Sequence, residues 1–255
     1  MRRLVLAVCL VSFLAGCSAL SGGSPPPSDE RAVTAVEAVN TSVSTVETYR
    51  FETEMHVAAS DGENSRTVRV DGNGVVNISA KRMRATTRTR GQTVDSYVDG
   101  YRAYQGCQEP WDGYAVENVS RSEPWTTATP LHRQLTLFER SNVYWEGNET
   151  IDGNRTMLVS AAPSAETIQS VMDRNGASNV ALNRGSLENA TARLWIDPDT
   201  NRPVKSELRL QLSQRGATAT ATLTLSYTGY GEPAQIAIPP AVYDDPYELG
   251  CPGAG

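Results

Sequence analysis

Two hydrophobic periodicities divide the chain. Between residues 29 and 46, alanines and valines recur at spacings of three and four, which places them on one face of a helix. These residues are Ala32, Val36, Val39, Val43 and Val46. Ser28 is the candidate N-cap, and Asp29 and Glu30 follow it where the helix dipole favours acidic side chains. We therefore expect an amphipathic N-terminal helix whose short side chains pack closely on a sheet.

From Tyr49 onward the apolar period falls to two, which predicts strands. The clearest strand alternates apolar residues with threonines, and a turn at 214–216 joins it to the alternating run before it. Asp99-Gly100 marks a second hairpin. Further strands are expected over 66–78, 81–89, 94–97, 101–104, 135–146, 155–161 and 192–196. Only Ser164–Arg174 has the pattern of a second helix, so the chain is predicted to form an α+β domain with a large antiparallel meander.

The N-terminus carries an export signal. Arg2 and Arg3 precede an apolar stretch over 4–14, which is too short to span a bilayer and ends in Leu-Ala-Gly-Cys. This ending is typical of a lipobox, in which Cys17 receives a diacylglyceryl group. We predict a signal peptide over 1–16, a lipidated Cys17 with a Ser/Gly/Pro tether over 17–28, and a single domain over 29–255. The two acyl chains would anchor the domain stably to the outer, extracytoplasmic face of the cell membrane.

The charge balance is acidic, with 23 basic and 29 acidic residues and a net charge of -6. Such a surface argues against nucleic acid as a partner. The only lysines are Lys81 and Lys205. Low lysine with excess acid favours a halophilic archaeal source, although a GC-rich genome would also enrich arginine.

Four cysteines are present, and two of them fall in the N-terminal signal region. The remaining pair, Cys107 and Cys251, is expected to form a disulfide in an oxidising compartment. Two free thiols or metal ligands are the alternative. His56 and His132 lack the spacing of a zinc site, so no metal is expected. Six N-x-S/T sequons also occur, of which Asn118, Asn148 and Asn154 are candidate glycosylation sites; a chain rich in Ser, Thr and Asn also produces sequons by chance.

Two side-chain clusters have open interpretations. Four arginines of one strand parity could bind a phosphate or sulfate group, or form a solvated outer face paired with carboxylates. They are Arg82, Arg84, Arg88 and Arg90. Aromatic residues around Cys107 could form a carbohydrate or partner platform, or pack locally around the disulfide. They are Tyr97, Tyr101, Tyr104, Trp111, Tyr114 and Trp125.

The lipobox, the tether, the single amphipathic helix and the long meander resemble LolA-type and LppX-type lipoproteins. The Tyr-Val-Asp-Gly-Tyr hairpin over 97–101 and the turn Leu-Trp-Ile-Asp-Pro-Asp-Thr-Asn-Arg-Pro-Val-Lys over 194–205 add to this resemblance, which extends to haloarchaeal surface lipoproteins. It implies a strongly curved sheet, an open half-barrel, whose concave face is covered by helices and can hold acyl chains. The lipid anchor distinguishes this chain from soluble carriers that move between membranes.

Sequence motifs of catalysis are missing. The chain has no Gly-x-Ser-x-Gly, no His-Glu-x-x-His and no phosphate-binding glycine loop, so we expect neither an enzyme nor a cofactor. We expect a membrane-anchored lipoprotein that binds a lipid or another apolar ligand in a cavity lined by Ala217, Ala219, Ala221 and Leu223. These small residues could instead let the N-terminal helix approach closely and leave nothing open. The alternative function is a structural or protein-interaction module of the cell surface, with an envelope protein as partner and no ligand pocket.

Overall fold

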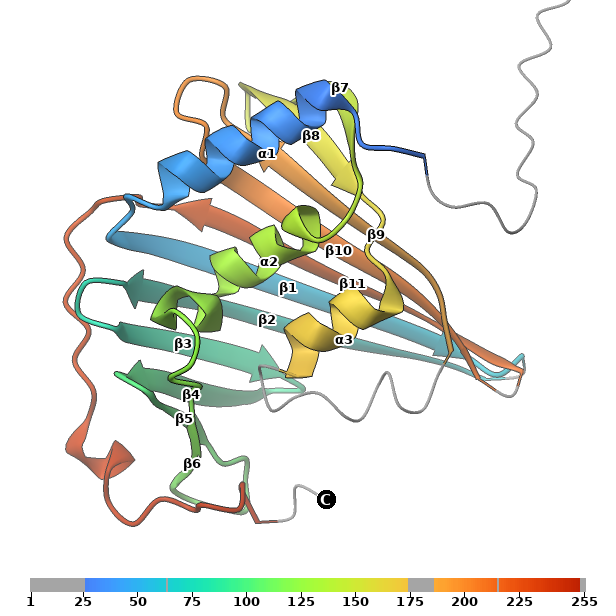
Figure 1. Ribbon diagram of the computed structural model, residues 1–255. Helices are drawn as coiled ribbons and strands as arrows, with labels where there is room; N and C mark the ends of the chain where they lie inside the picture. The colour runs from blue at the N-terminus through green and yellow to red at the C-terminus, as the bar shows by residue number, and fades with distance from the viewer. Residues whose placement is uncertain (1–25, 63, 174–185, 215, 253–255) are drawn as a thin grey trace, which may run out of the picture.

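One large antiparallel sheet organises the molecule (Figure 1). The computed structural model describes residues 26–62, 64–173, 186–214 and 216–252. Within them an 11-stranded sheet has the order β6-β5-β4-β3-β2-β1-β11-β10-β9-β8-β7. Its strands are β1 Thr48–Ser60, β2 Ser65–Asn77, β3 Arg82–Thr89, β4 Gln92–Asp99, β5 Arg102–Gly106, β6 Tyr114–Asn118, β7 Val143–Ile151, β8 Asn154–Ala161, β9 Ser186–Ile196, β10 Pro203–Gln214 and β11 Ala217–Thr228.

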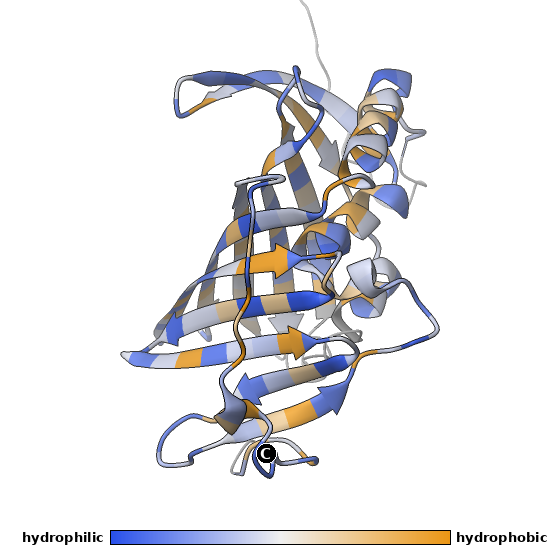
Figure 2. Ribbon diagram, turned by 90° about the vertical axis from the view of Figure 1, so that its left-hand side faces the viewer, coloured by the Kyte–Doolittle hydropathy of each residue, from blue (hydrophilic) through white to orange (hydrophobic). Residues whose placement is uncertain are grey.

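Three α-helices of the described residues lie on one side of this curved sheet (Figures 1 and 2). They are α1 Glu30–Val43, α2 Pro130–Glu139 and α3 Ala165–Asp173, and short 3-10 turns occur at Trp125–Ala128 and Pro240–Val242. Hydrophobic and hydrophilic residues alternate along the strands in Figure 2, so each strand has one apolar side. The predicted fold class, an α+β domain with a large curved antiparallel sheet covered by helices, is confirmed.

Helix α2 was not expected, and it replaces the first part of the strand expected over 135–146. The strand β7 begins only at Val143. Pro130 is the first residue of α2, where its missing N–H costs nothing, and Leu131, Leu135 and Phe138 then recur at helical spacing. The N-cap of α1 also differs, because the Asp29 carboxylate accepts a hydrogen bond of 2.8 Å from the Arg31 N–H. Three helices therefore cover the sheet instead of the expected two.

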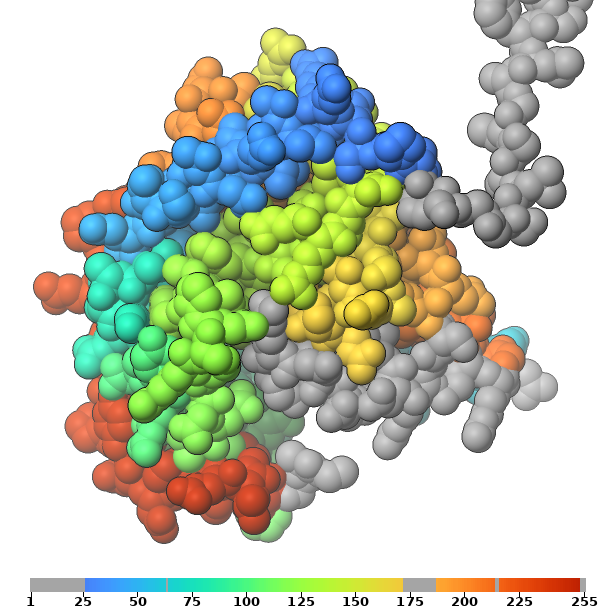
Figure 3. Space-filling view, viewed as in Figure 1, coloured from blue at the N-terminus to red at the C-terminus, as the bar shows by residue number. Residues whose placement is uncertain are grey.

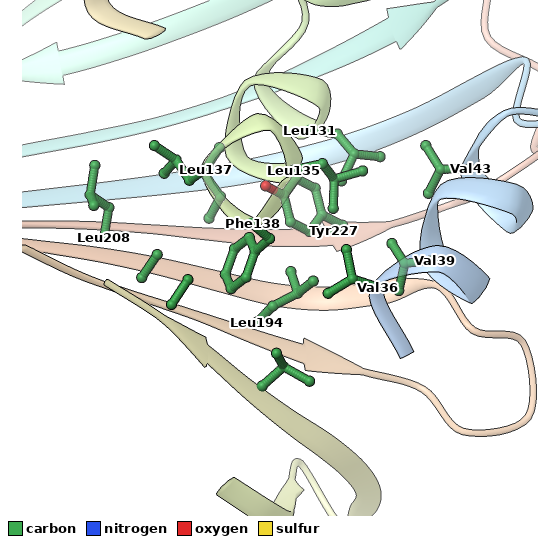
Figure 4. Close-up of a cluster of buried hydrophobic side chains, with 14 of the residues drawn as sticks. Val36, Val39, Val43, Leu131, Leu135, Leu137, Phe138, Leu194, Leu208 and Tyr227 are labelled. Atoms are coloured by element: carbon green, nitrogen blue, oxygen red, sulfur yellow. The ribbon is translucent and has the colours of Figure 1, made fainter. Parts of the chain in front are cut away.

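The main core lies between these helices and the sheet. Figure 4 shows valines of α1 and leucines of α2 meeting Leu194, Leu208 and Tyr227 of the strands. The phenol groups inside this core have partners: the hydroxyls of Tyr227 and Ser206 are 2.9 Å apart, and the Tyr49 hydroxyl accepts a hydrogen bond from the Leu131 N–H at 3.3 Å. Because buried polar groups without partners are costly, the bond between Leu131 and Tyr49 helps to fix α2 on the sheet, and the bond between Ser206 and Tyr227 joins β10 to β11.

The chain after β11 forms a strap, residues 229–252, that crosses the strand ends from β1 to β6 (Figure 1). The Asn77 amide donates to the Ala234 carbonyl at 2.8 Å, and the Tyr243 hydroxyl donates to the Asp99 carboxylate at 2.7 Å. Tyr247 then pairs with the outer edge of β6. The strap ends in the disulfide between Cys107 and Cys251, the pair expected from the sequence.

The predicted signal peptide, Cys17 and most of the tether lie outside the described residues. The last tether residues are placed beside β7, where the Pro26 carbonyl accepts hydrogen bonds from the Asn142 amide and the Tyr144 hydroxyl at 2.8 and 2.7 Å. Among the helices of the described residues, none has the length and apolar character needed to cross a membrane.

Candidate functional site

Strand register decides which side chains face the helices. Ala221 pairs with Val57 on β1 and with Leu210 on β10, and Leu223 pairs with Met55 on β1. Paired residues of adjacent strands share a face of the sheet. Ala221 and Leu223 pack against the main core, which fixes this face as the concave one. All four residues expected to line a cavity therefore point to the concave side: Ala217, Ala219, Ala221 and Leu223.

The concave face has a half-exposed part, which we name the open apolar floor. It is formed by apolar side chains from five neighbouring strands, β9, β10, β11, β1 and β2, each of them neither fully buried nor fully exposed. Its residues are Met55, Val57, Val68, Val70, Leu187, Leu212, Ala217, Ala219, Ala221 and Leu223. At the other ends of the same strands, Tyr49 and Leu194 are completely inaccessible to solvent. The concave face is thus completely buried at one end and only partly buried at the other.

The position of α1 explains this difference. Helix α1 lies across the buried end of the sheet and contacts β7 and α2, away from the N-terminal half of β11 (Figure 1). In Figure 3, α1, α2 and α3 lie side by side over the upper part of this face. Ala217, Ala219 and Ala221 keep part of their surface exposed, and Ala221 packs against the main core.

A polar group lies at the buried end, on α2. Arg133 is largely buried, and its Nε atom has no hydrogen-bond partner among the described residues. Burial lowers the pKa of Arg133 to about 10, while the nearby Tyr49 and Glu117 raise it. Burial raises the pKa of Glu117, with Arg133 acting in the opposite direction. The concave face therefore combines a wide apolar surface with a partly buried cation, Arg133, at its covered end.

The residue before this cation is also perturbed. Burial lowers the pKa of His132, whose Nδ1 atom lies 3.2 Å from the Thr129 hydroxyl. Gln134 on the same helix has a buried side-chain oxygen without a partner among the described residues. Neither Arg133 nor its neighbours could be singled out from the sequence, because the helix that buries them was itself not predicted. The Pro130 start signal and the spacing of Leu131, Leu135 and Phe138 would have revealed it.

The convex face carries paired charges. Arg82 lies 3.0 Å from Asp99, and Arg84 lies 3.6 Å from Asp95. These two arginines therefore follow the second interpretation, an outer face on which arginines pair with carboxylates. Arg90 falls after β3, in a turn at positive φ, and does not belong to the strip. A shallow cavity of about 390 Å³ on this side is bordered by both signs of charge, including Arg50, Glu52, Arg84 and Arg88.

The remaining candidate residues are dispersed. Asn118 is exposed at the end of β6, and Asn148 and Asn154 are exposed in the hairpin of β7 and β8. Of the aromatic cluster, Tyr97 and Tyr104 are buried with Val242 of the strap, and Trp125 is buried in the main core. Trp111 is exposed. Among the described residues, no group of three or more His, Cys, Asp or Glu side chains could hold a metal ion.

No family model and no curated protein matches this sequence. Solved structures do match the fold. The neighbours include lipoproteins. The lipoprotein LppX of Mycobacterium tuberculosis is 16% identical, with a TM-score of 0.49, and the match covers 82% of this chain and 100% of that one. LprF of Mycobacterium bovis is 13% identical, with a TM-score of 0.45, over 84% of this chain and 99% of that one. A LolA superfamily protein of Nitrosomonas europaea is 9% identical, with a TM-score of 0.28, over 82% and 94%.

These neighbours carry the two family names that the sequence resembles. At TM-scores below 0.5, the function has to be argued from the residues of this chain. The open apolar floor is the feature on which this argument rests, because an apolar surface stabilises a bound molecule through burial of apolar area.

Proposed function

We propose that this chain is a membrane-anchored extracytoplasmic lipoprotein that binds a lipid or another apolar ligand on the open apolar floor. The floor itself supports the proposal, since soluble domains seldom leave such a contiguous apolar surface without a use. Its alanines leave room for an acyl chain, and its flanking strands supply Met55, Val57 and Leu223 as contacts. The anchor would be the lipidated Cys17. Binding, without catalysis, is the activity we propose.

Native mass spectrometry with lipid extraction tests this proposal. The full chain is purified from the membranes of its host beside a Cys17→Ser variant. The anchor hypothesis predicts a diacylglyceryl adduct in the wild type that is missing from the variant. The binding hypothesis predicts a second, non-covalent lipid at one copy per folded domain in both proteins. A variant without any co-purifying lipid would contradict the binding hypothesis and leave the anchor untouched.

A pair of adjacent substitutions provides a matched control. Ala221 faces the concave side, while Thr220 beside it faces the convex side. Ala221→Trp fills the floor and should remove the bound lipid, whereas Thr220→Trp should retain it. Both variants should unfold within a few degrees of wild type, because a half-exposed position can accommodate a larger side chain. If Ala221→Trp unfolds the protein, the floor is already filled and the proposal fails.

A protein-interaction role is the second candidate, and exposed apolar side chains near the disulfide favour it. Trp111, Tyr243 and Tyr247 are exposed there, and Leu249 is fully exposed. Such residues are enriched in partner-binding surfaces. Crosslinking in intact cells, compared between wild type and Leu249→Ser, would recover an envelope protein only from wild type if this surface binds one. Equal recovery from both would count against it.

A further inference from the structure

Three buried side-chain polar atoms of the described residues lack a hydrogen-bond partner, and all three belong to α2 or to the segment just after it. In the described part of the chain they are Arg133 Nε, Gln134 Oε1 and Ser141 Oγ. The first two belong to α2, and Ser141 follows its end. Arg133 is the most consequential of the three, because a buried charge without a counter-charge is more unfavourable than a neutral polar group.

The side chain of Arg133 leaves α2 on the side away from α1. Arg133 and Leu137 are four residues apart, so they lie on the same face of the helix. Figure 4 shows Leu137 on the side of α2 nearer Leu208, with Val39 and Val43 of α1 on the opposite side. Leu208 pairs with Leu223 of the open apolar floor. Arg133 therefore lies on the face of α2 away from α1, and the charged or titratable groups that act on it are Tyr49 of β1 and Glu117 of β6.

The surroundings of Arg133 contain no ion-pair partner. Among the described residues, no carboxylate lies within the 4.0 Å that defines an ion pair with this guanidinium. Glu117 acts on it only at longer range. Even with a pKa lowered to about 10, the guanidinium remains charged at neutral pH. It is a positive group whose buried Nε donor has no hydrogen-bond partner among the described residues.

We propose that Arg133 binds the anionic headgroup, a phosphate, sulfate or carboxylate, of an amphiphile whose apolar part lies on the open apolar floor. This inference rests on the proposed function, and it adds the class of ligand. A guanidinium donates two parallel hydrogen bonds to such a group, and a sheltered position strengthens them.

The distance between the two parts of the site suits an amphiphile. Tyr49, which lies under the start of α2, and Met55, which belongs to the floor, are six residues apart on β1. In an extended strand six residues span roughly 20 Å. A molecule with a charged end and a long apolar part can occupy both places, whereas a free inorganic ion would occupy only the first.

Three probes separate these cases: a phosphatidylglycerol, the uncharged diacylglycerol with the same acyl chains, and sodium phosphate alone. Each is titrated into the full chain carrying Cys17→Ser, with native mass spectrometry as the readout. The protein with Arg133 intact should bind phosphatidylglycerol with an affinity roughly 10- to 100-fold higher than that for diacylglycerol, which is the range that a charge-assisted hydrogen bond provides. Arg133→Leu should bind both lipids equally, and Arg133→Lys should keep a smaller preference, because its ammonium retains the charge but cannot donate the two parallel hydrogen bonds.

Arg140→Leu is the matched control. Arg140 follows α2, is exposed and contacts Ser170, so its loss should leave the preference unchanged. Circular dichroism verifies that each variant is folded, and Arg133→Gln, which removes the charge but keeps a polar side chain, provides the test if Arg133→Leu is not folded. Equal binding of the two lipids by the protein with Arg133 intact, or a preference that survives Arg133→Leu, overturns the headgroup assignment alone. Binding of neither lipid overturns the proposed function with it. Binding of phosphate without lipid, lost in Arg133→Leu, assigns Arg133 to a free anion and also overturns the proposal.

Discussion

Removing the disulfide should be the largest single loss of stability available in this chain. The bond joins Cys107 to Cys251, which are 144 residues apart in sequence. In the chain-entropy model, closing a loop of that length stabilises the fold by about 5 kcal/mol. For a domain of this size each kcal/mol corresponds to roughly 2–4 °C, so the double variant Cys107→Ala/Cys251→Ala should melt roughly 10–20 °C lower.

The loss should begin at the strap. After Val242, which is buried against Tyr97 and Tyr104, the strap is held more weakly. Without the disulfide, the residues that follow Val242 are held by the exposed Tyr243 bond to Asp99 and by the pairing of Tyr247 with β6. Limited proteolysis of the double variant should therefore cut within the strap before the rest of the domain unfolds.

Guanidinium unfolding followed by tryptophan fluorescence measures the effect, with differential scanning calorimetry for the melting temperature. A reducing agent should bring wild type to the level of the double variant and leave that variant unchanged. If the double variant is within about 1 kcal/mol of oxidised wild type, loop closure is not what holds the strap, and the entropic reasoning is refuted.

Two further predictions concern the sheet and α2. Gly74→Val should destabilise the fold by roughly 2 kcal/mol or more in chemical unfolding, because a Cβ at Gly74 would overlap the Phe51 ring and lie 2.7 Å from the Arg84 carbonyl oxygen. Asn73 is the exposed neighbour, and Asn73→Ala should be nearly neutral in the same assay. Burial lowers the pKa of His132 from 6.5, so as the pH falls the unfolded chain takes up this proton before the folded chain does. The free energy of unfolding should therefore be unaffected by this group above pH 6.5 and should decline as the pH falls from 6.5 toward the folded-state pKa. His132→Gln should lack this part of the decline, and parallel curves for the two proteins would contradict the prediction.

Local patterns predicted most of this fold. Alternation located β2, β3, β8 and β11 almost to the residue, because each buries one side of the strand. The pair Cys107 and Cys251 followed from counting cysteines. The same logic failed for α2, where 135–146 was taken as one strand although a helix ends at Glu139 and β7 starts at Val143.

The candidate site was less accessible to prediction, and the reason is physical. The side of β11 that carries its alanines follows from its period of two, so their concave position could be predicted. Whether that face is open depends on where α1 and α2 lie, and short-range patterns do not contain that information. The burial of Arg133 depends on the same packing, which joins residues as distant in sequence as Tyr49 and Glu117.

The contacts of Pro26 place the start of the described chain at a particular edge of the sheet. Its carbonyl is held by Asn142 and Tyr144 at the start of β7, so the described chain begins at one lateral edge of the sheet. The strap and the disulfide lie at the other edge, beyond β6. If Cys17 carries the proposed lipid, the tether therefore joins the domain at the β7 edge. Asn118 and the exposed aromatic residues beside the disulfide lie at the opposite edge of the sheet, far from the point of attachment.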